Sequence, residues 1–344
     1  MRRVLIPTHI VPAAPVAGGE LFTLAGQSMG TTWSVRLVER ARTDAQCLQR
    51  WQQGIQGELD TVVMQMSHWL DDSDLGRFNR AGASAWQTLP EAFFEVLTYA
   101  LGVAADSAGA YDPTAGALVN AWGFGPTGRH DLPGFQPPSA PAVETARSRG
   151  GWRRLQVDTR TRSICQPGGL LLDFSAVAKG YGVDRVAAYL ERAGIASYLV
   201  EVGGELRGRG VKPDQLPWWV ELERPLDFEP NGLMVSPPPT VVALHGLAVA
   251  TSGDYRRCYR DGDRRLAHTI DPRTGYPIDN GVASVTVLHD SCMAADALST
   301  ALSVLGPDDG LAFAAERELA ARFLVRGDSG FVERASPAFL AMLQ

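Results

Sequence analysis

The 344-residue chain is 45% hydrophobic and 20% charged, proportions typical of a globular protein with a substantial core. Its 32 basic and 38 acidic residues give a net charge of -6, which argues against a broad nucleic-acid-binding surface. No run of about 18 or more apolar residues is present, so the sequence predicts no transmembrane helix. The four cysteines form no C-x-x-C pair, which argues against a zinc or dithiol redox motif.

The first 20 residues are rich in Pro, Ala and Gly and predict a flexible leader. Residues 21–344 predict one domain, with two subdomains as the alternative. The apolar run at the start stops at Pro7, too early for a signal-peptide core, and no lipoprotein cysteine precedes Cys47. The sequence as it stands predicts a cytoplasmic protein, whereas an upstream extension encoding a signal peptide would make it periplasmic.

The first half of the chain has four predicted elements. Residues 22–38 predict a hairpin, with an alternating strand after a Gly-containing turn at 26–30. Residues 47–66 have apolar side chains at helical spacing, and residues 72–79 predict a capped turn. Residues 90–108 predict a second long helix, with Pro90 near its first position.

The second half mixes strands and helices. Strands are predicted at 152–157, 169–174, 198–202, 241–250 and 284–288, and helices at 182–193 and 294–305. Because these elements do not follow a strict βαβ alternation, the sequence favours an α+β fold with mixed, largely antiparallel sheets and flanking helices.

Two oxygen-bearing side chains share one face of the last of these helices. Asp296 and Thr300 are four residues apart, so they lie one turn apart on the same side. A carboxylate and a hydroxyl suit Mg²⁺, which takes oxygen ligands and keeps several waters or phosphate oxygens. An acid favoured by the helix dipole, beside a hydroxyl that merely packs, is the alternative.

His268 has the most suggestive setting of the six histidines, because it precedes the turn Asp271-Pro272-Arg273-Thr274-Gly275. An imidazole with an ordinary pKa of about 6.5 can act as a general base near neutral pH. A strand-end histidine bonded to a backbone carbonyl is the alternative.

Residues 172–182 predict a strand, a loop of small residues and a helix start. Free N–H groups at a helix start favour an anion, and Lys179 adds a cation for phosphate. The segment matches neither the Walker nor the Rossmann glycine pattern, so a tight turn with a solvated lysine is the alternative. The rings of Trp69 and Tyr111 could stack on a planar ligand or pack in the core.

Taken in order, these segments resemble the ApbE family of FAD:protein FMN transferases from about Gly26 to Leu305. The motifs that carry the resemblance are Ser28-Met29-Gly30-Thr31, residues 73–79, Tyr111-Asp112-Pro113-Thr114 with Trp122-Gly123-Phe124-Gly125, residues 173–184, Gly203-Gly204, residues 250–255, residues 268–277 and residues 295–300. The fold implied is an ApbE-like one.

The resemblance implies an activity and a set of roles. The family cuts the pyrophosphate of FAD with Mg²⁺, moves FMN to a threonine hydroxyl of an acceptor protein and releases AMP. The acceptor implied here is a subunit of a redox complex. His268 and Asp296 fall at catalytic positions, and the metal ligands implied are Asp296, Thr300 and the carbonyl of Ala176. The residues at flavin-contacting positions are Met29, Trp69, Ala110, Tyr111, Asp112, Asp173, Lys179 and Ile270.

Two other activities would use the same residues. A Mg²⁺-dependent FAD pyrophosphatase would give FMN and AMP with water as the acceptor, and a flavin-binding protein would have no turnover. His268, Asp296 and Thr300 speak against the second, because storage requires neither a base nor a metal. Trp69 stands where the family commonly has a tyrosine, and Ser175 where it frequently has a glycine.

Overall fold

An eight-stranded sheet organises the protein in the computed structural model, which describes residues 2–10, 13–40, 43–225, 228–229, 232–233, 237–262, 264–328 and 330–344. Every neighbouring pair in it is antiparallel, which confirms the predicted α+β fold with largely antiparallel sheets. In spatial order its strands are β2 (Gly19–Ser28), β3 (Thr31–Arg40), β7 (Ser197–Val202), β8 (Glu205–Arg209), β13 (Leu247–Gly253), β18 (Val282–His289), β19 (Ala320–Gly327) and β20 (Gly330–Ala335).

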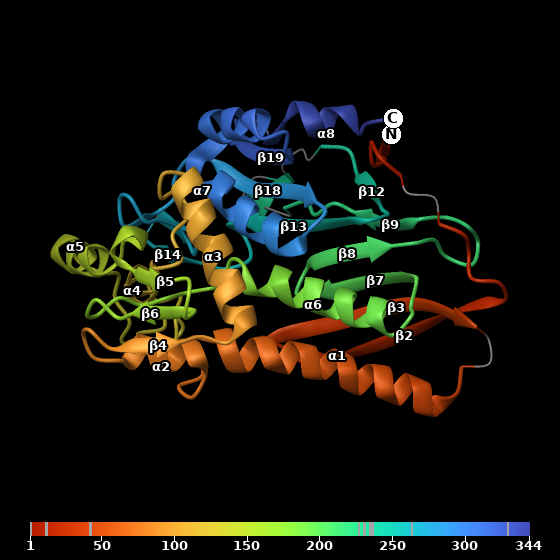
Figure 1. Ribbon diagram of the computed structural model, residues 1–344. Coiled ribbons are helices and arrows are strands. Elements are labelled where there is room, and N and C mark those ends of the chain that lie inside the picture. Colours follow the sequence, from red (N-terminus) through yellow and green to blue (C-terminus); the bar gives the residue numbers. More distant parts are fainter. Residues whose placement is uncertain are drawn as a thin grey trace.

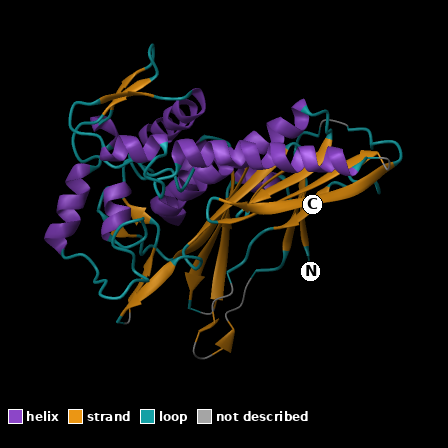
Figure 2. Cartoon of the chain, turned by 90° about the horizontal axis from the view of Figure 1, so that it is seen from below, coloured by secondary structure: helices purple, strands orange, loops and turns teal. Residues whose placement is uncertain are grey.

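Long helices cover one face of this sheet, as Figures 1 and 2 show. Helices α1 (Ala45–Met66), α6 (Ala178–Arg192) and α7 (Cys292–Glu316) contact its strands, and α3 (Glu91–Asp106) packs on α1 and α7. The strands supply a matching apolar face, because side chains alternate across a strand. Tyr198, Val200 and Val202 pack in the cluster under α1 and α6, whereas Leu199 joins the cluster on the opposite face.

The opposite face carries a small second layer. It consists of β1 (Arg3–Leu5), β12 (Thr240–Leu244), β9 (Trp218–Glu221) and α8 (Pro337–Ala341). Here the predicted flexible leader is wrong for residues 3–5, which form a strand parallel to β12. The physical reason is burial, since Leu5 is fully buried beside Trp218 and Phe339.

A third group of short elements lies at one end of the sheet, at the left of Figure 1. It contains α2 (Asp74–Arg80), β4 (Trp86–Thr88), α4 (Gly116–Ala121), α5 (Ala140–Arg149), the 3-10 turn Trp152–Arg154, β5 (Gln156–Asp158) and β6 (Ser163–Cys165). The remaining short hairpins are β10 (Phe228–Glu229) with β11 (Gly232–Leu233), β14 (Cys258–Asp261) with β15 (Arg264–Ala267), and β16 (Ile270–Asp271) with β17 (Tyr276–Pro277). Within the described ranges, no helix combines the length and apolarity needed to cross a bilayer.

Several predicted elements differ from the structure. The strand expected at 152–157 is the 3-10 turn Trp152–Arg154 followed by β5, and the turn expected at 72–79 is largely helix α2. The strand expected at 169–174 is irregular, with a single bridge from Leu171 to Ala115. The strand expected at 241–250 is two strands in different sheets, separated at Gly246, whose φ of +76° turns the chain. Helix α6 begins four residues before the predicted 182, and α7 runs past 305 through a break at Gly306. Local patterns do not show such boundaries, because tertiary packing sets them.

Burial of Leu5 makes a stability prediction. Leu5→Ala should lower the free energy of unfolding by about 2–4 kcal/mol, because the lost side chain leaves a cavity in a packed cluster. Chemical denaturation of the variant and the wild-type protein measures the difference. Ile10→Ala is the matched control: its side chain is 55% exposed, and its stability should change by no more than about 0.5 kcal/mol. Equal stability of the Leu5 variant would show that the first strand does not hold the second layer together.

Candidate active site

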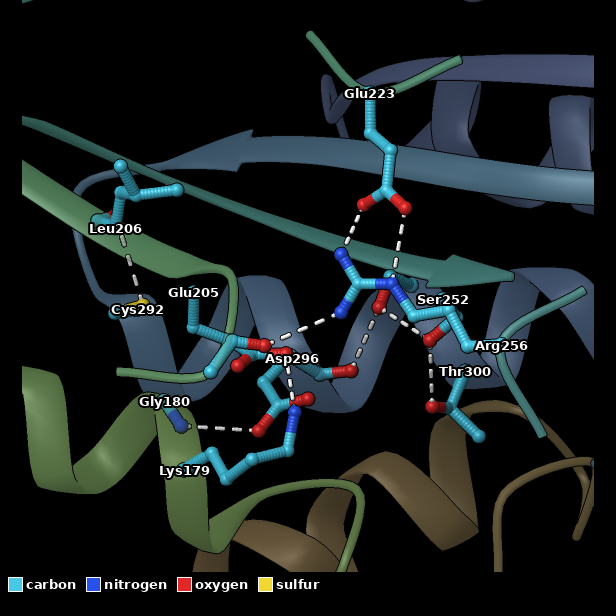
Figure 3. A network of polar contacts seen from close by, with 12 residues as sticks. Lys179, Gly180, Glu205, Leu206, Glu223, Ser252, Arg256, Cys292, Asp296 and Thr300 are labelled. Carbon is cyan, nitrogen blue, oxygen red and sulfur yellow. Dashed lines mark hydrogen bonds and ion pairs between the residues drawn. The ribbon is translucent and has the colours of Figure 1, made fainter. Parts of the chain in front are cut away.

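The N-terminus of α6 meets the first turns of α7 in a buried polar cluster (Figure 3). Asp296 Oδ2 of α7 accepts a hydrogen bond of 3.0 Å from the backbone N–H of Gly180. Lys179 Nζ forms an ion pair with Glu205, at the start of β8. Asp296 and Glu205 are both almost fully buried. Three ionisable groups that the sequence separates by up to 117 positions thus lie together.

Burial sets the electrostatics of this cluster. It raises the pKa of Asp296, and the Lys179 ammonium and the Gly180 N–H offset only part of that effect. Burial alone would lower the pKa of Lys179, but the carboxylates of Asp296 and Glu205 raise it above its ordinary value. Glu205 Oε2 is buried and has no hydrogen-bond partner within the described part of the chain. The site therefore holds carboxylate oxygen that a further cation would stabilise.

Hydroxyl groups extend the cluster along α7. Thr300 Oγ1 lies 2.9 Å from Ser252 Oγ of β13, and Ser299 Oγ lies 2.8 Å from the same atom. Ser299 also donates to the Asp296 carbonyl at 2.9 Å. The structure thus places Asp296 and Thr300 one turn apart on a helix, as predicted, with Ser252 facing them.

The carboxylate and hydroxyl oxygens of this cluster are the type of ligand that Mg²⁺ prefers. The described residues contain no group of three or more His, Cys, Asp or Glu side chains that could hold a metal by themselves. Mg²⁺ needs few protein ligands, since it usually keeps waters and substrate phosphate oxygens. A buried carboxylate whose burial is only partly compensated, with the Thr300 hydroxyl one helical turn along α7, is a suitable partial site. Ala176, the third predicted ligand, lies two residues before α6 and packs against the main core.

Arg256 borders the same cluster, as Figure 3 shows. Its Nε donates to Glu223 at 2.9 Å, and its Nη1 donates to the Gly203 carbonyl at 3.2 Å. Gly204 has a φ of +102°, and a Cβ there would lie 2.8 Å from the guanidinium. Gly204 must therefore lack a side chain for Arg256 to lie against this turn.

His268 follows β15, and the backbone of Arg257 fixes its ring. Its Nδ1 lies 3.0 Å from the Arg257 carbonyl, and its backbone N–H donates to the same oxygen. Because a carbonyl oxygen can only accept, Nδ1 carries the hydrogen and Nε2 keeps its lone pair. Burial lowers the pKa of His268 to about 4, with further lowering from Arg257, Lys179 and Arg256. The imidazole is therefore neutral at pH 7 and able to accept a proton.

The predicted flavin-contacting residues differ in their surroundings and in how far they are buried. Met29, at the β2–β3 turn, reaches Gly182 near the start of α6. The segments of Asp112 and Asp173 are joined by a 2.8 Å hydrogen bond from Asp173 N–H to the Pro113 carbonyl. Ala110, Tyr111 and Ile270 are buried. The Tyr111 ring packs within the main core, so that ring is not free to stack on a ligand.

Trp69 is the aromatic side chain of this set that remains accessible, being 43% exposed. Arg129 lies 5.9 Å from its ring centroid, a cation–π distance. The neighbouring His68 is buried, with Nδ1 3.4 Å from Asp173 Oδ1. No local pattern singles out His68, because its contact with Asp173 spans more than 100 positions.

Sequence reasoning also missed Glu205, Ser252 and Arg256 as members of the site. Glu205 follows the Gly203-Gly204 pair directly, and Ser252 and Arg256 lie in or next to a motif already recognised. A charged residue immediately after a glycine pair at a strand end was the available signal. No local pattern shows that these residues face α6 and α7.

The environment of His268 predicts both the pKa of its imidazole and how the stability of the free protein depends on pH. Its imidazole should titrate with a pKa of about 4. The unfolded chain takes up this proton at about pH 6.5 and the folded protein only at about pH 4, so the stability contributed by this residue should fall as the pH falls through that window. Histidine-selective NMR measures the pKa, and His268→Gln should flatten this part of the stability profile. A His268 resonance that titrates at about pH 6.5 would contradict the prediction.

Known proteins share both the sequence and the fold. The model of the ApbE family matches residues 29–323. The FAD:protein FMN transferase of Vibrio cholerae is 38% identical over 93% of this chain and 92% of its own, and that of Klebsiella pneumoniae is 36% identical over 96% and 91%. The apo form of the Pseudomonas stutzeri flavinyl transferase ApbE superposes with a TM-score of 0.82 at 37% identity, over 94% of this chain and 97% of its own. The Vibrio cholerae flavin transferase ApbE gives 0.83 at 36% identity, over 94% and 99%. This chain belongs to the ApbE family.

Proposed function

We propose that this protein transfers FMN from FAD to a threonine hydroxyl of an acceptor protein and releases AMP, in a Mg²⁺-dependent reaction. The observation that carries the proposal is the buried Asp296 carboxylate beside Lys179, whose charge also helps to keep the His268 imidazole neutral. The names of the relatives, FAD:protein FMN transferase, support the same reaction.

Asp296, Thr300 and the carbonyl of Ala176 would hold the magnesium ion. The ion would supply charge neutralisation on the pyrophosphate of FAD. Asp296 is suited to this role because burial has already raised its pKa, so a bound cation would relieve the cost of its negative charge.

Lys179 and the start of α6 would bind the pyrophosphate. Lys179 stays protonated because two buried carboxylates face it, and the N-terminal N–H groups of a helix attract phosphate oxygens. Transfer of a phosphoryl group depends mainly on position and on stabilised charge, not on covalent help from the protein. A cation held in place by an ion pair, as Lys179 is by Glu205, meets that need because it reorganises little during the reaction.

His268 would act as the general base through Nε2. The threonine oxygen forms a bond to the FMN phosphorus, and its proton moves to His268 Nε2. The bond from that phosphorus to the bridging oxygen breaks, and AMP leaves with the bridging oxygen. The Arg257 carbonyl supports this role, because its hydrogen bond from Nδ1 holds the ring in the tautomer that can accept a proton.

Hydrolysis of FAD to FMN and AMP is the second candidate, with water in place of the threonine. The same cluster would serve it, so the two reactions differ only in the nucleophile. A flavin-binding protein without turnover is less well supported, because binding alone gives no reason to bury Asp296 next to Lys179 and also to keep His268 neutral. For the transfer reaction, we propose that the protein that accepts FMN is a subunit of a redox complex.

Mass spectrometry distinguishes transfer from hydrolysis. The protein is incubated with FAD, Mg²⁺ and a purified redox-subunit domain that contains a candidate target threonine. The domain should gain one FMN adduct while AMP appears in equal amount. The matched control is the same domain with that threonine replaced by alanine, which should gain nothing. Release of AMP and FMN without a mass gain on the domain would favour hydrolysis.

Two variants separate the proposed roles of Asp296 and His268. Asp296→Asn should remove Mg²⁺-dependent turnover, because an amide binds the cation poorly, while FAD affinity stays within a few-fold. His268→Gln should slow single-turnover transfer by about 10²–10⁴-fold, the usual contribution of a general base, also with little loss of FAD affinity. Rapid-quench kinetics and flavin fluorescence titrations measure the two effects. Unchanged turnover in the Asp296 variant contradicts the metal role, and a large loss of FAD affinity alone would make His268 a binding residue.

A further inference from the structure

The N-terminus of α7 is capped by a residue of another helix as well as by its own. Ser291, the residue before α7, accepts from the Ala294 N–H at 3.2 Å in the ordinary way. Asp184 of α6 adds a second cap across 108 positions of the chain. Its Oδ1 accepts from the Cys292 N–H at 3.0 Å, and its Oδ2 accepts from the Met293 N–H at 2.9 Å and from the Ser291 hydroxyl at 2.8 Å.

A second tie joins the same two helices one turn away. Gly180 lies four residues before Asp184 on α6, and Asp296 lies four residues after Cys292 on α7. The Gly180 N–H donates to Asp296 Oδ2, while Asp184 holds the N–H of Cys292. These two hydrogen bonds lie one helical turn apart on both helices, so together they limit how far one helix can slide along the other.

The helices are close enough that this register matters. A Cβ at Gly180 would lie 2.2 Å from the Cys292 carbonyl oxygen and 2.8 Å from Asp296 Cβ. Backbone therefore contacts backbone at the crossing, and no side chain separates the two helices. A small shift of α7 would change the distance between Lys179 and Asp296 directly.

Strand β8 connects Asp184 to the rest of the site. Arg207 forms an ion pair with Asp184, and Glu205, two residues earlier, forms the ion pair with Lys179. Residues two apart on a strand point to the same face, so β8 presents one acidic and one basic group to α6. Asp184 thus receives hydrogen bonds from α7 and from β8 at the same time.

We infer that Asp184 is a positioning residue for the proposed reaction: by capping α7 from α6, it sets the register that places Asp296 and Thr300 beside Lys179. The inference rests on the proposed function, because Asp296 and Thr300 matter there as the metal ligands. Asp184 is not itself a ligand in this proposal. Its loss should weaken metal binding while every ligand remains in the chain.

Metal affinity of the Asp184→Asn variant tests the inference. The amide keeps one acceptor oxygen and turns an N–H₂ group toward the donors on the other side, so half of the cap and the charge that pairs with Arg207 are lost with little change in size. Mn²⁺ binding to the protein alone, followed by electron paramagnetic resonance, should weaken by about 10-fold or more, the usual effect of losing a residue that orients a ligand. The Mg²⁺ concentration for half-maximal transfer should rise by a similar factor. The KM for FAD should stay within about two-fold and kcat should recover at high Mg²⁺, because the positioning residue touches neither substrate.

Two further variants separate positioning from helix capping in general. Asp44→Ala removes the cap of α1, where Asp44 Oδ1 accepts from the Cys47 N–H at 2.7 Å, away from the site. It should lower the melting temperature as a lost cap does and leave Mn²⁺ affinity unchanged. Ser291→Ala removes the hydroxyl that donates to Asp184 and should weaken Mn²⁺ binding a few-fold. It provides the test if Asp184→Asn fails to fold.

The outcomes are distinct. Weaker Mn²⁺ binding in the Asp184 and Ser291 variants, with wild-type binding in the Asp44 variant, supports the inference. Wild-type Mn²⁺ affinity in the Asp184 variant, or in the Ser291 variant where the Asp184 variant does not fold, overturns it and leaves Asp184 a structural cap. Wild-type protein that neither binds Mn²⁺ nor shows Mg²⁺-dependent transfer would contradict the proposed function itself, and the inference with it.

Discussion

The close crossing of α6 and α7 is the contact on which the site depends. Gly180 makes it feasible, because any side chain there would collide with the Cys292 carbonyl. The same contact brings the N-terminus of one helix against the acidic face of the other, so a backbone N–H meets the Asp296 carboxylate. The eight-stranded sheet supports the crossing from below, since α6 packs on β7 and β8, and α7 on β13 and β18. The sheet thus holds α6 and α7 in one register.

The second constraint is the burial of charge. Glu205 and Asp296 lie out of water beside the half-buried Lys179, and in such a place an unpaired ion is costly and a paired one is held firmly. The cluster contains more carboxylate than cation unless Arg256 is counted, and Arg256 is already shared with Glu223. Such a site favours an incoming cation and, with it, an anionic substrate. The ion pairs are therefore better understood as preparation for binding than as a source of stability.

His268 belongs to a different part of the structure, and this separation has a chemical use. The β14–β15 hairpin and its Arg257 carbonyl fix the imidazole, whereas the two crossing helices fix the charged cluster. The positive charges of Arg257, Lys179 and Arg256 help to keep the ring neutral. A neutral base beside fixed cations can take a proton from an incoming hydroxyl without first losing one of its own.

The sequence by itself determined the elements with strong local patterns and the residues whose spacing is local. The period of apolar residues predicted α1, Pro90 indicated the start of α3, and the four-residue spacing of Asp296 and Thr300 placed them on one helical face. The motif order gave the family. Only the tertiary structure showed that Leu5 is core, that residues 241–250 divide between two sheets, and that Tyr111 is packed and Trp69 exposed. It also showed that five residues not singled out from the sequence lie at or next to the site: Glu205, Ser252, Arg256, His68 and Asp184. Their partners lie on other elements far along the chain, and such contacts follow from how helices pack on a sheet, which no local pattern of residues encodes.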